Sequence, residues 1–305
     1  MRSDIDHLPQ RQQDELERVK RILMDEFAVA TSRATQPWKR NGKILKIILF
    51  GSYARDDWVD EPENGYQSDF DILVIVSHKE LTEIADYWYV AEDKILRDPE
   101  IGRLVNIIVH TMDEVNDALA RGEYFWVDVA RDGIALYELP GFSLASPQPL
   151  TPADAYKLSS SYLERQLPSA DEWLELAGHA LSKGNAGEWP KKAAFNLHQA
   201  TETLYVCFLL VWTFYSPRSH NIKFLRSFAE ERDQRLIDAW PRATRVERRR
   251  FELLKRAYVD ARYSDAYEIS MEDLAALSQS VERLRSLVDE ICQERVAELR
   301  TSAGI

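Results

Sequence analysis

The sequence predicts an α+β fold, in which a mixed sheet flanked by helices is followed by a separate all-α bundle. Three observations predict it. Up to residue 147, apolar runs of strand length alternate with helical patterns, and beyond it only helical periods occur. A proline-rich connector separates the two patterns. We therefore expect one domain over residues 1–147 and a second over residues 148–305, an ordinary division for a chain of 305 residues.

The first domain is expected to begin with an amphipathic helix at 8–33, because apolar residues such as Leu16, Val19, Leu23 and Phe27 recur at helical spacing. Runs rich in β-branched residues then predict strands, the first of which stops at a glycine. In chain order, the later elements are expected at 44–50 (strand), 70–76 (strand), 81–96 (helix), 104–109 (strand), 113–120 (helix), 125–131 (a short segment) and 134–139 (strand).

The second domain is expected to be a bundle of five or six helices. Residues that favour the first turn of a helix indicate where most of these helices begin. Ser169 with Glu172, and Thr244 with Glu247, have the spacing of a capping box, and Pro190 suits a first helical turn. The expected helices are 169–181, 190–212, 219–230, 244–262 and 271–298, with Ser219 as the cap of the third.

The negative charge lies almost entirely in the first domain. Of 39 basic and 51 acidic residues in the chain, 17 and 28 precede residue 148, so that domain carries −11 of the net charge of −12. This balance argues against a protein that coats nucleic acid. An acidic domain holds cations readily, and it repels polyphosphate unless cations intervene.

No segment directs the chain to a membrane. The longest strongly apolar run, 204–212, is far shorter than the roughly 20 residues that span a bilayer. The charged first twenty residues cannot serve as the apolar core of a signal peptide. Cys207 and Cys292 lack metal-ligand spacing and are expected to be buried, reduced thiols. We therefore expect a cytoplasmic protein with no membrane partner.

Gly51 and Ser52 follow the first strand and open what reads as a short helix. Glycine allows backbone to approach a phosphate closely, and the amides at a helix start face an anion favourably. Ser52 adds a hydroxyl donor. Alone, this pattern is also that of an ordinary turn.

Asp69 and Asp71 stand at the start of the second strand. Because they are two residues apart, both side chains point to one face of the strand. Paired carboxylates are the ligands that Mg²⁺ or Mn²⁺ prefers, with phosphate oxygens and water completing the shell. In order and in strand context, the two motifs predict a metal-assisted phosphate site.

The stretch Gly51-Ser52-Tyr53-Ala54-Arg55 with Asp69-Phe70-Asp71 resembles the DNA polymerase β-like nucleotidyltransferase superfamily, in particular its small prokaryotic members. The resemblance implies Mg²⁺-dependent transfer of a nucleoside monophosphate from a nucleoside triphosphate to a hydroxyl of a protein, an RNA or a small molecule. It makes Asp69 and Asp71 catalytic metal ligands. It makes Gly51, Ser52 and Arg55 nucleotide-binding residues.

The sequence departs from that pattern on the next strand. Members of the superfamily usually supply a third carboxylate there, and this chain has Asn106, whose amide cannot accept a proton. Either the acceptor brings its own base, or Asp128 or Asp132 takes the role, or catalysis is slow or absent. The acidic segment between Ser52 and Asp69 is also long, and we interpret it as an insertion rather than a lid.

The stretches 192–202, 219–222 and 256–263 resemble the HEPN helical domain. The resemblance implies a bundle that binds nucleotide or acceptor, or that dimerises, so we expect a homo-oligomer. Arg256 and Arg262 would grip phosphate, and Tyr263 matches a tyrosine that accepts nucleotides in toxin–antitoxin members. The alternative for Tyr263, which its helical context favours, is a tyrosine packed in the core of the bundle. The histidine of ribonuclease members falls on Ala261.

Three hypotheses follow. The first is a nucleotidyltransferase whose HEPN domain binds nucleotide or acceptor, or dimerises. The second, motivated by Asn106, is a nucleotide-binding regulatory protein without turnover. The third is a degenerate toxin–antitoxin fusion with HEPN ribonuclease ancestry, in which Arg256 would be required for RNA cleavage.

Overall fold

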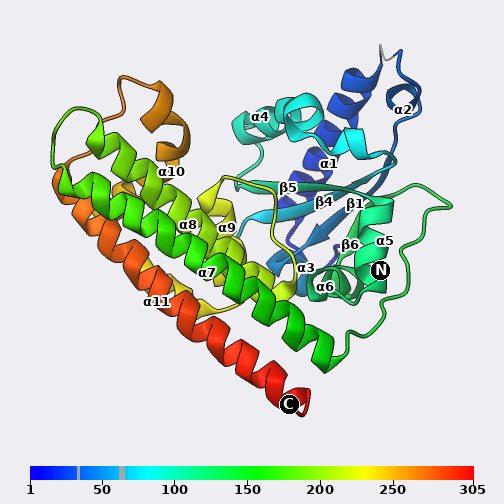
Figure 1. The fold of residues 1–305 in the computed structure, drawn as a ribbon. Coiled ribbons are helices and arrows are strands. Elements are labelled where there is room, and N and C mark those ends of the chain that lie inside the picture. The colour runs from blue at the N-terminus through cyan, green and yellow to red at the C-terminus, as the bar shows by residue number, and fades with distance from the viewer. Residues whose placement is uncertain (33–34, 62–65) are drawn as a thin grey trace. The chain divides into compact units, whose positions relative to one another are not determined.

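The computed structural model describes residues 1–32, 35–61 and 66–305 (Figure 1). The chain divides into two compact units, Met1–Pro149 and Leu150–Ile305. The first contains the sheet and the second is helical, which confirms the α+β class predicted from the sequence. No helix in the described part of the chain is both long enough and apolar enough to cross a membrane.

The first unit is built on a mixed sheet of four strands in the order β5-β4-β1-β6. The strands are β1 (Ile44–Phe50), β4 (Phe70–Val76), β5 (Val105–Thr111) and β6 (Ile134–Glu138). Strands β4 and β5 are parallel, whereas β1 runs antiparallel to both β4 and β6. The bounds predicted for β1 and β4 are confirmed residue for residue, because their apolar runs are buried along their whole length.

Helices cover both faces of this sheet (Figure 1). Helices α1 (Gln10–Thr31) and α4 (Tyr89–Arg97) share one core with sheet residues such as Ile47 and Ile72. Helices α5 (Met112–Ala120) and α6 (Tyr124–Asp132) lie over the other face, where Phe125 packs edge-on against Phe50 with ring centroids 5.6 Å apart. The short segment expected at 125–131 is thus a helix.

The helix expected at 81–96 is divided. The segment forms a 3₁₀ turn η2 (Lys79–Thr82), a π turn η3 (Ile84–Trp88) and then α4. The buried indole of Trp88 donates a hydrogen bond from Nε1 to the Leu81 carbonyl oxygen at 2.8 Å. This bond from a side chain to a backbone carbonyl seven residues earlier accompanies the irregular start, which helical periodicity alone could not predict.

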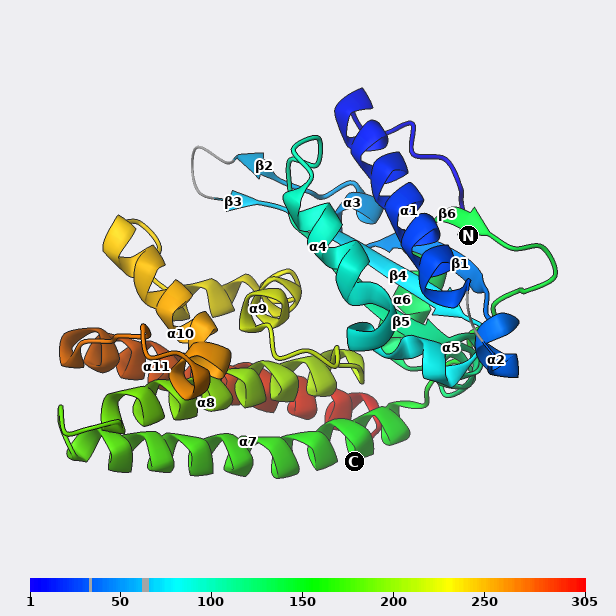
Figure 2. The ribbon, with the colours of Figure 1, turned by 90° about the horizontal axis from the view of Figure 1, so that it is seen from above.

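The helical unit contains α7 (Pro152–Ser182), α8 (Trp189–Thr213), α9 (Ile222–Glu230), η4 (Gln234–Ala239), α10 (Arg245–Tyr263) and α11 (Met271–Ser302). Within this unit α7, α8 and α11 run side by side (Figure 2). The thiols of Cys207 on α8 and Cys292 on α11 are buried, as predicted. The hydrogen bond with Cys207, and then burial, raise the pKa of the Cys292 thiol well above its usual value.

Two predicted caps are wrong. Ser169 starts no helix, because α7 begins at Pro152 and continues through Pro168. Its N-cap is Thr151, whose side chain accepts from the Asp154 amide. Packing of α7 along α8 outweighs the hydrogen bond that a proline removes. Helix α9 is capped by Asn221 rather than Ser219. The box of Thr244 and Glu247 at the start of α10 is confirmed, with both of its hydrogen bonds present.

Candidate functional site

Three polar side chains meet on neighbouring strands. Because β4 and β5 are parallel and Asp71 pairs with Asn106 in register, the two side chains lie on the same face of the sheet. Asn106 Nδ2 lies 3.0 Å from Asp71 Oδ1 and 3.4 Å from Asp69 Oδ2. Asp71 is buried and Asp69 is half-buried. The structure therefore brings Asp69, Asp71 and Asn106 into one cluster, as the sequence predicted.

Gly51 lies against this cluster. Phe50 pairs with Asp71, so the glycine directly follows the end of the β1–β4 ladder. A Cβ atom on Gly51 would lie 2.4 Å from Asp71 Oδ2, and its φ of 74° lies in the left-handed region that glycine tolerates. The chain thus approaches the carboxylate as closely as backbone without a side chain can.

Ser52 is buried, and its Oγ has no hydrogen-bond partner among the residues that the structure describes. An unpartnered buried hydroxyl costs free energy, so its retention beside the carboxylates indicates a partner outside the chain. The helix that Ser52 opens, α3 (Ser52–Arg55), is a single turn. It sums few peptide dipoles, so the predicted dipole contribution is small and the hydroxyl carries more of the argument.

Arg55 is held by a neighbour on the same loop. Its Nε lies 3.0 Å from Asp57 Oδ2, and its side chain is partly exposed. The guanidinium therefore lies at the turn, as predicted, but it is engaged with a carboxylate. A phosphate group would have to share it with Asp57 or displace that carboxylate.

The donor set fits a hard cation only in part. Within residues 1–32, 35–61 and 66–305, no three His, Cys, Asp or Glu side chains are grouped to hold a metal ion. Asp69 and Asp71 nevertheless offer two carboxylates on one face, and Asn106 offers an amide oxygen if it turns. Two carboxylates with an amide, phosphate oxygens and water make an acceptable shell for Mg²⁺ or Mn²⁺.

The two carboxylates proposed to replace the missing third one are already paired. Arg131 Nη2 lies 3.0 Å from Asp128 Oδ1 and 2.6 Å from Asp132 Oδ2 on the same helix. Hydrogen bonding to Asp132, followed by the attraction of both carboxylates, raises the pKa of Arg131. Either aspartate would have to leave this ion pair to act as a base.

The acidic segment after α3 forms a ribbon of β2 (Asp60–Glu61) and β3 (Tyr66–Gln67). The carboxylate of Asp60 accepts from Gln67 Nε2 at 2.8 Å and from Gln12 Nε2 on α1 at 3.4 Å. Residues 62–65, including Glu63 of the acidic run, lie outside the described residues. The described part is thus joined to α1, in keeping with the interpretation as an insertion.

The residues predicted in the helical unit lie on the last turns of α10. Arg256 forms an ion pair with Asp260 at 2.7 Å, as on an ordinary exposed helix. The guanidinium of Arg262 lies 4.5 Å from the Tyr258 ring centroid and 5.0 Å from that of Tyr263. Tyr263 is 76% exposed, so the alternative that it is a packed core tyrosine is wrong.

The helical unit contains a polar cluster of which the sequence indicates only a part. Glu202 on α8 accepts from His220 Nδ1 at 3.0 Å and lies 3.6 Å from Nε2 of the buried His198. His198 Nδ1 lies 3.0 Å from the Leu254 carbonyl oxygen of α10. The spacing of His198 and Glu202 was visible in the sequence. The participation of His220 was not, because it depends on the path of the chain after α8.

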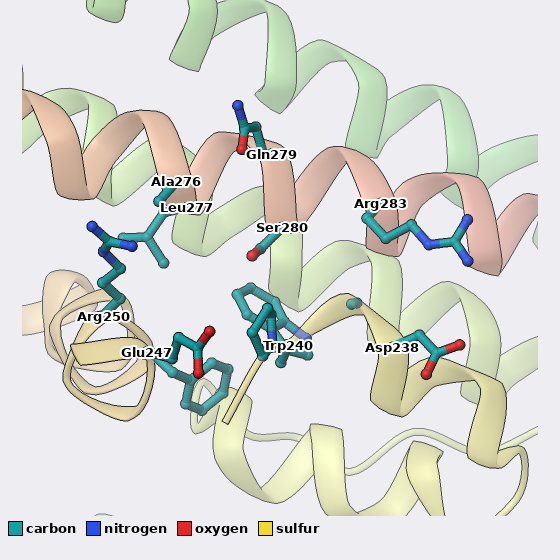
Figure 3. Close-up of a pocket in the computed structure, with 12 residues that line it drawn as sticks. Asp238, Trp240, Glu247, Arg250, Ala276, Leu277, Gln279, Ser280 and Arg283 are labelled. Atoms are coloured by element: carbon teal, nitrogen blue, oxygen red, sulfur yellow. The ribbon is translucent and has the colours of Figure 1, made fainter. Parts of the chain in front are cut away.

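A cavity of about 310 Å³ also opens in the helical unit. Figure 3 shows Arg250 of α10 and Arg283 of α11 at its sides, with Trp240 between them. Arg250 is engaged by Asp273 at 3.0 Å and by Glu272 at 2.8 Å. Arg250 thus already has carboxylate partners, and none of the catalytic, nucleotide-binding or HEPN site residues predicted from the sequence lines the cavity.

The fold and the cluster define a nucleotide-transferring domain followed by a HEPN bundle. Residues 33–125 match the nucleotidyltransferase domain family and residues 163–291 match the HEPN domain family, so the chain belongs to the nucleotidyltransferases, with a C-terminal HEPN domain. A curated relative from Methanocaldococcus jannaschii, described as a putative protein adenylyltransferase, is 35% identical over 101 residues. That match covers 32% of this chain and 84% of the relative.

Proposed function

We propose that this protein is a Mg²⁺- or Mn²⁺-dependent enzyme that moves a nucleoside monophosphate from a nucleoside triphosphate to a hydroxyl group. One observation carries the proposal. The buried hydroxyl of Ser52, which has no hydrogen-bond partner among the described residues, adjoins a glycine that lies directly against the Asp71 carboxylate. A hydroxyl that can donate a hydrogen bond to a phosphate and a carboxylate that can bind a cation therefore lie side by side, at the end of the β1–β4 ladder.

The chain's own groups take separate roles in this proposal. Ser52 Oγ donates to a phosphate oxygen, and the absence of a side chain at Gly51 lets that phosphate come near the carboxylates. Asp69 and Asp71 would hold the cation, with Asn106 turned so that Oδ1 faces it. When bound, the cation supplies charge neutralisation for the triphosphate and the leaving pyrophosphate.

The reaction forms a bond from the acceptor hydroxyl oxygen to the α-phosphorus and breaks the bond between that phosphorus and the oxygen bridging to the β-phosphate. Pyrophosphate leaves, and the hydroxyl proton goes to a base. Asn106 cannot take the proton. Because Asp128 and Asp132 are paired with Arg131, we assign the base to the acceptor or to water. This assignment predicts slow turnover.

A protein hydroxyl is the favoured acceptor. The name of the curated relative describes transfer of adenylate to protein. Among the side chains whose exposure the structure describes, Tyr263 is the most exposed large apolar or aromatic one, and its ring lies beside the cationic Arg262. An exposed phenol next to a guanidinium suits an attacking group that meets a polyphosphate. We therefore propose ATP as donor and Tyr263 as a modification site, within one chain or between chains.

Labelling tests both proposals. The purified protein is incubated with each of the four α-labelled nucleoside triphosphates and Mg²⁺, with and without added RNA. Label on the protein together with pyrophosphate release is expected, and both should vanish in Asp69→Asn and Asp71→Asn. Tyr263→Phe should lose the label, whereas Tyr89→Phe, which alters another exposed tyrosine, should keep it. Label that persists in both aspartate variants would contradict the proposed site.

A second candidate function is nucleotide-dependent regulation without transfer, and Asn106 favours it. In that case each nucleotide would raise the melting temperature without releasing pyrophosphate. The ribonuclease alternative has less support, because Arg256 is paired with Asp260 and Ala261 takes the place of the histidine. It requires RNA cleavage that Arg256→Ala abolishes. The proposed homo-oligomer, formed through the helical domain, is tested by light scattering of the intact chain.

A further inference from the structure

A buried guanidinium lies behind the candidate site. The side chain of Arg103, which precedes β5, is 1% exposed, and its Nε lies 2.7 Å from Oε2 of Glu15 on α1, which is equally buried. Its Nη1 donates to the Tyr53 hydroxyl. One cation thus joins α1, the segment before β5 and the residue that follows Ser52.

The same guanidinium lies against one aromatic residue from each part of the site, the turn that carries Ser52 and the strand that carries Asp69 and Asp71. Its carbon lies 5.1 Å from the Tyr53 ring centroid and 4.9 Å from the Phe70 ring centroid. The two rings pack edge to face at 4.6 Å. Tyr53 is covalently next to Ser52, and Phe70 lies between Asp69 and Asp71. A shift of the guanidinium therefore moves the hydroxyl relative to the carboxylates.

Fold stability is a poor explanation for this arrangement. Burying an ion pair costs desolvation free energy, and well-packed apolar residues often replace such a pair without loss. Moreover, Arg103 Nη2 is buried without a hydrogen-bond partner in the described part of the chain, lying 3.6 Å from Asp60 Oδ2. A charge that is incompletely satisfied and still retained is better explained by the geometry that it imposes.

Other contacts fix the same turn from the N-terminal segment. His7 Nε2 lies 2.9 Å from the Tyr53 carbonyl oxygen, and Arg2 donates to the Ala54 carbonyl oxygen. These hydrogen bonds to the Tyr53 and Ala54 carbonyl oxygens restrict the movement of the turn. The bond from Arg103 to the Tyr53 hydroxyl adds the side-chain anchor that links the turn to β4.

We propose that Arg103 is a positioning residue for nucleotidyl transfer. It sets the separation between the Ser52 hydroxyl and the Asp69–Asp71 pair without touching substrate or cation. This inference rests on the proposed function. Because phosphate and cation must be held in one geometry at the transition state, a displacement of about 1 Å lowers the transfer rate by about 100-fold. Ground-state binding changes less, since each half keeps its own contacts.

The test compares Arg103→Met with Arg18→Met. Arg18 joins α1 to Asp98 by an ion pair at 2.5 Å, and its side chain is 37% exposed, so Arg18→Met removes a more exposed ion pair of the same helix. We expect Arg103→Met to lower kcat by about 100-fold while KM for the triphosphate changes by less than about 3-fold. Arg103→Lys, which keeps the charge for Glu15, should recover part of kcat. Arg18→Met should keep the wild-type kcat.

Hydrogen exchange tests whether Arg103 fixes the turn, and it does so independently of turnover. Exchange of the Tyr53, Ala54 and Arg55 amides should accelerate by about 10-fold in Arg103→Met and stay unchanged in Arg18→Met, at a temperature where both remain folded. Equal exchange in the two variants, or equal kcat per folded molecule, would overturn the proposal. A wild-type protein that transfers no nucleotide would instead reject the proposed function, and the exchange comparison would still show whether Arg103 fixes the turn.

Discussion

The Asp71 carboxylate occupies the space that a side chain at Gly51 would need, since a Cβ there would lie 2.4 Å from Asp71 Oδ2. The contact joins the end of β1 to the start of β4 at the pair formed by Phe50 and Asp71. In the sequence, Gly51 has the pattern of a common turn residue. In the structure, the carboxylate opposite it leaves room for glycine and not for a residue with a side chain.

Gly51→Ala should therefore displace Asp71 and abolish most transfer. The strain of a positive φ alone costs about 1–3 kcal/mol in a residue with a side chain. Gly141→Ala supplies the matched control, because Gly141 also has a positive φ, of 91°, and nothing lies within 4 Å of its added Cβ. Urea unfolding should show a loss of stability in both variants, larger in Gly51→Ala because its Cβ also clashes with Asp71. Pyrophosphate release should fall by at least about 10-fold in Gly51→Ala only. Equal activity of the two variants would contradict this relationship.

Ser52→Ala should leave stability nearly unchanged while weakening nucleotide binding. Its hydroxyl is buried without a partner in the described chain, so removing it forfeits no internal hydrogen bond. Ser159→Ala removes a buried hydroxyl that donates to the Val211 carbonyl oxygen at 2.9 Å and should cost about 1 kcal/mol. Calorimetry with a non-hydrolysable triphosphate should show about a 10-fold loss of affinity in Ser52→Ala alone, the loss expected for one hydrogen bond to a charged group. Unchanged affinity would remove Ser52 from the site.

Asn106→Asp should restore a third carboxylate beside Asp69 and Asp71. Nδ2 now lies 3.0 Å from Asp71 Oδ1, so a carboxylate there places like charges in contact and lowers stability without metal. Added Mg²⁺ should raise the melting temperature of this variant more than that of the wild type, and pyrophosphate release should increase. Asn106→Leu, which removes the amide and adds no charge, should gain neither property. A variant indifferent to Mg²⁺ would argue against a cation at this cluster.

Asp273 should stabilise the helical unit less at acid pH. Burial by itself would raise the pKa of its carboxyl, but hydrogen bonds from Arg250, Ser270 and Arg249 outweigh burial and hold that pKa below its usual value of 3.8. Because the folded pKa is the lower one, this contribution is present above pH 3.8 and is lost as the pH falls through the folded value.

The test is urea unfolding of Asp273→Asn at about pH 6 and about pH 3. The variant should lose stability relative to the wild type at the higher pH, and the difference should shrink at the lower pH. Asp265→Asn, at an exposed position of the same unit, should show little effect at either pH. A difference between Asp273→Asn and wild type that does not change with pH would contradict the assignment to a charged carboxylate.

Residue type and spacing over short stretches of the sequence predicted most of the helices and strands. Runs of mostly apolar residues located β1 and β4, because a strand that is buried on both faces has few polar positions, here only Lys46 and Asp71. The box of Thr244 and Glu247 located α10, because its two hydrogen bonds form within four residues of one another. The pair Asp69 and Asp71 was likewise visible, because strand geometry puts alternate residues on one face.

The failures share one cause. Continuation of α7 through Pro168 depends on packing against α8, and the irregular start of α4 depends on a bond from Trp88 to Leu81. The first is tertiary packing, and the second is a bond from a buried side chain to a backbone carbonyl. Neither is visible in a local helix preference. The alternative that Tyr263 packs in the core was wrong for a related reason, because helical spacing gives the face on which a residue lies but not what covers it.

The sequence by itself thus determined the order of elements, the family motifs and the absence of a third acidic residue at Asn106, because these depend on residue type and spacing. Only the tertiary structure decided that Asn106 bridges the carboxylates, that Asp71 fills the space beside Gly51, and that Arg103 joins Tyr53 to Phe70. Those contacts bring together residues far apart in the chain. Their geometry follows from strand register and core packing, which no local pattern encodes.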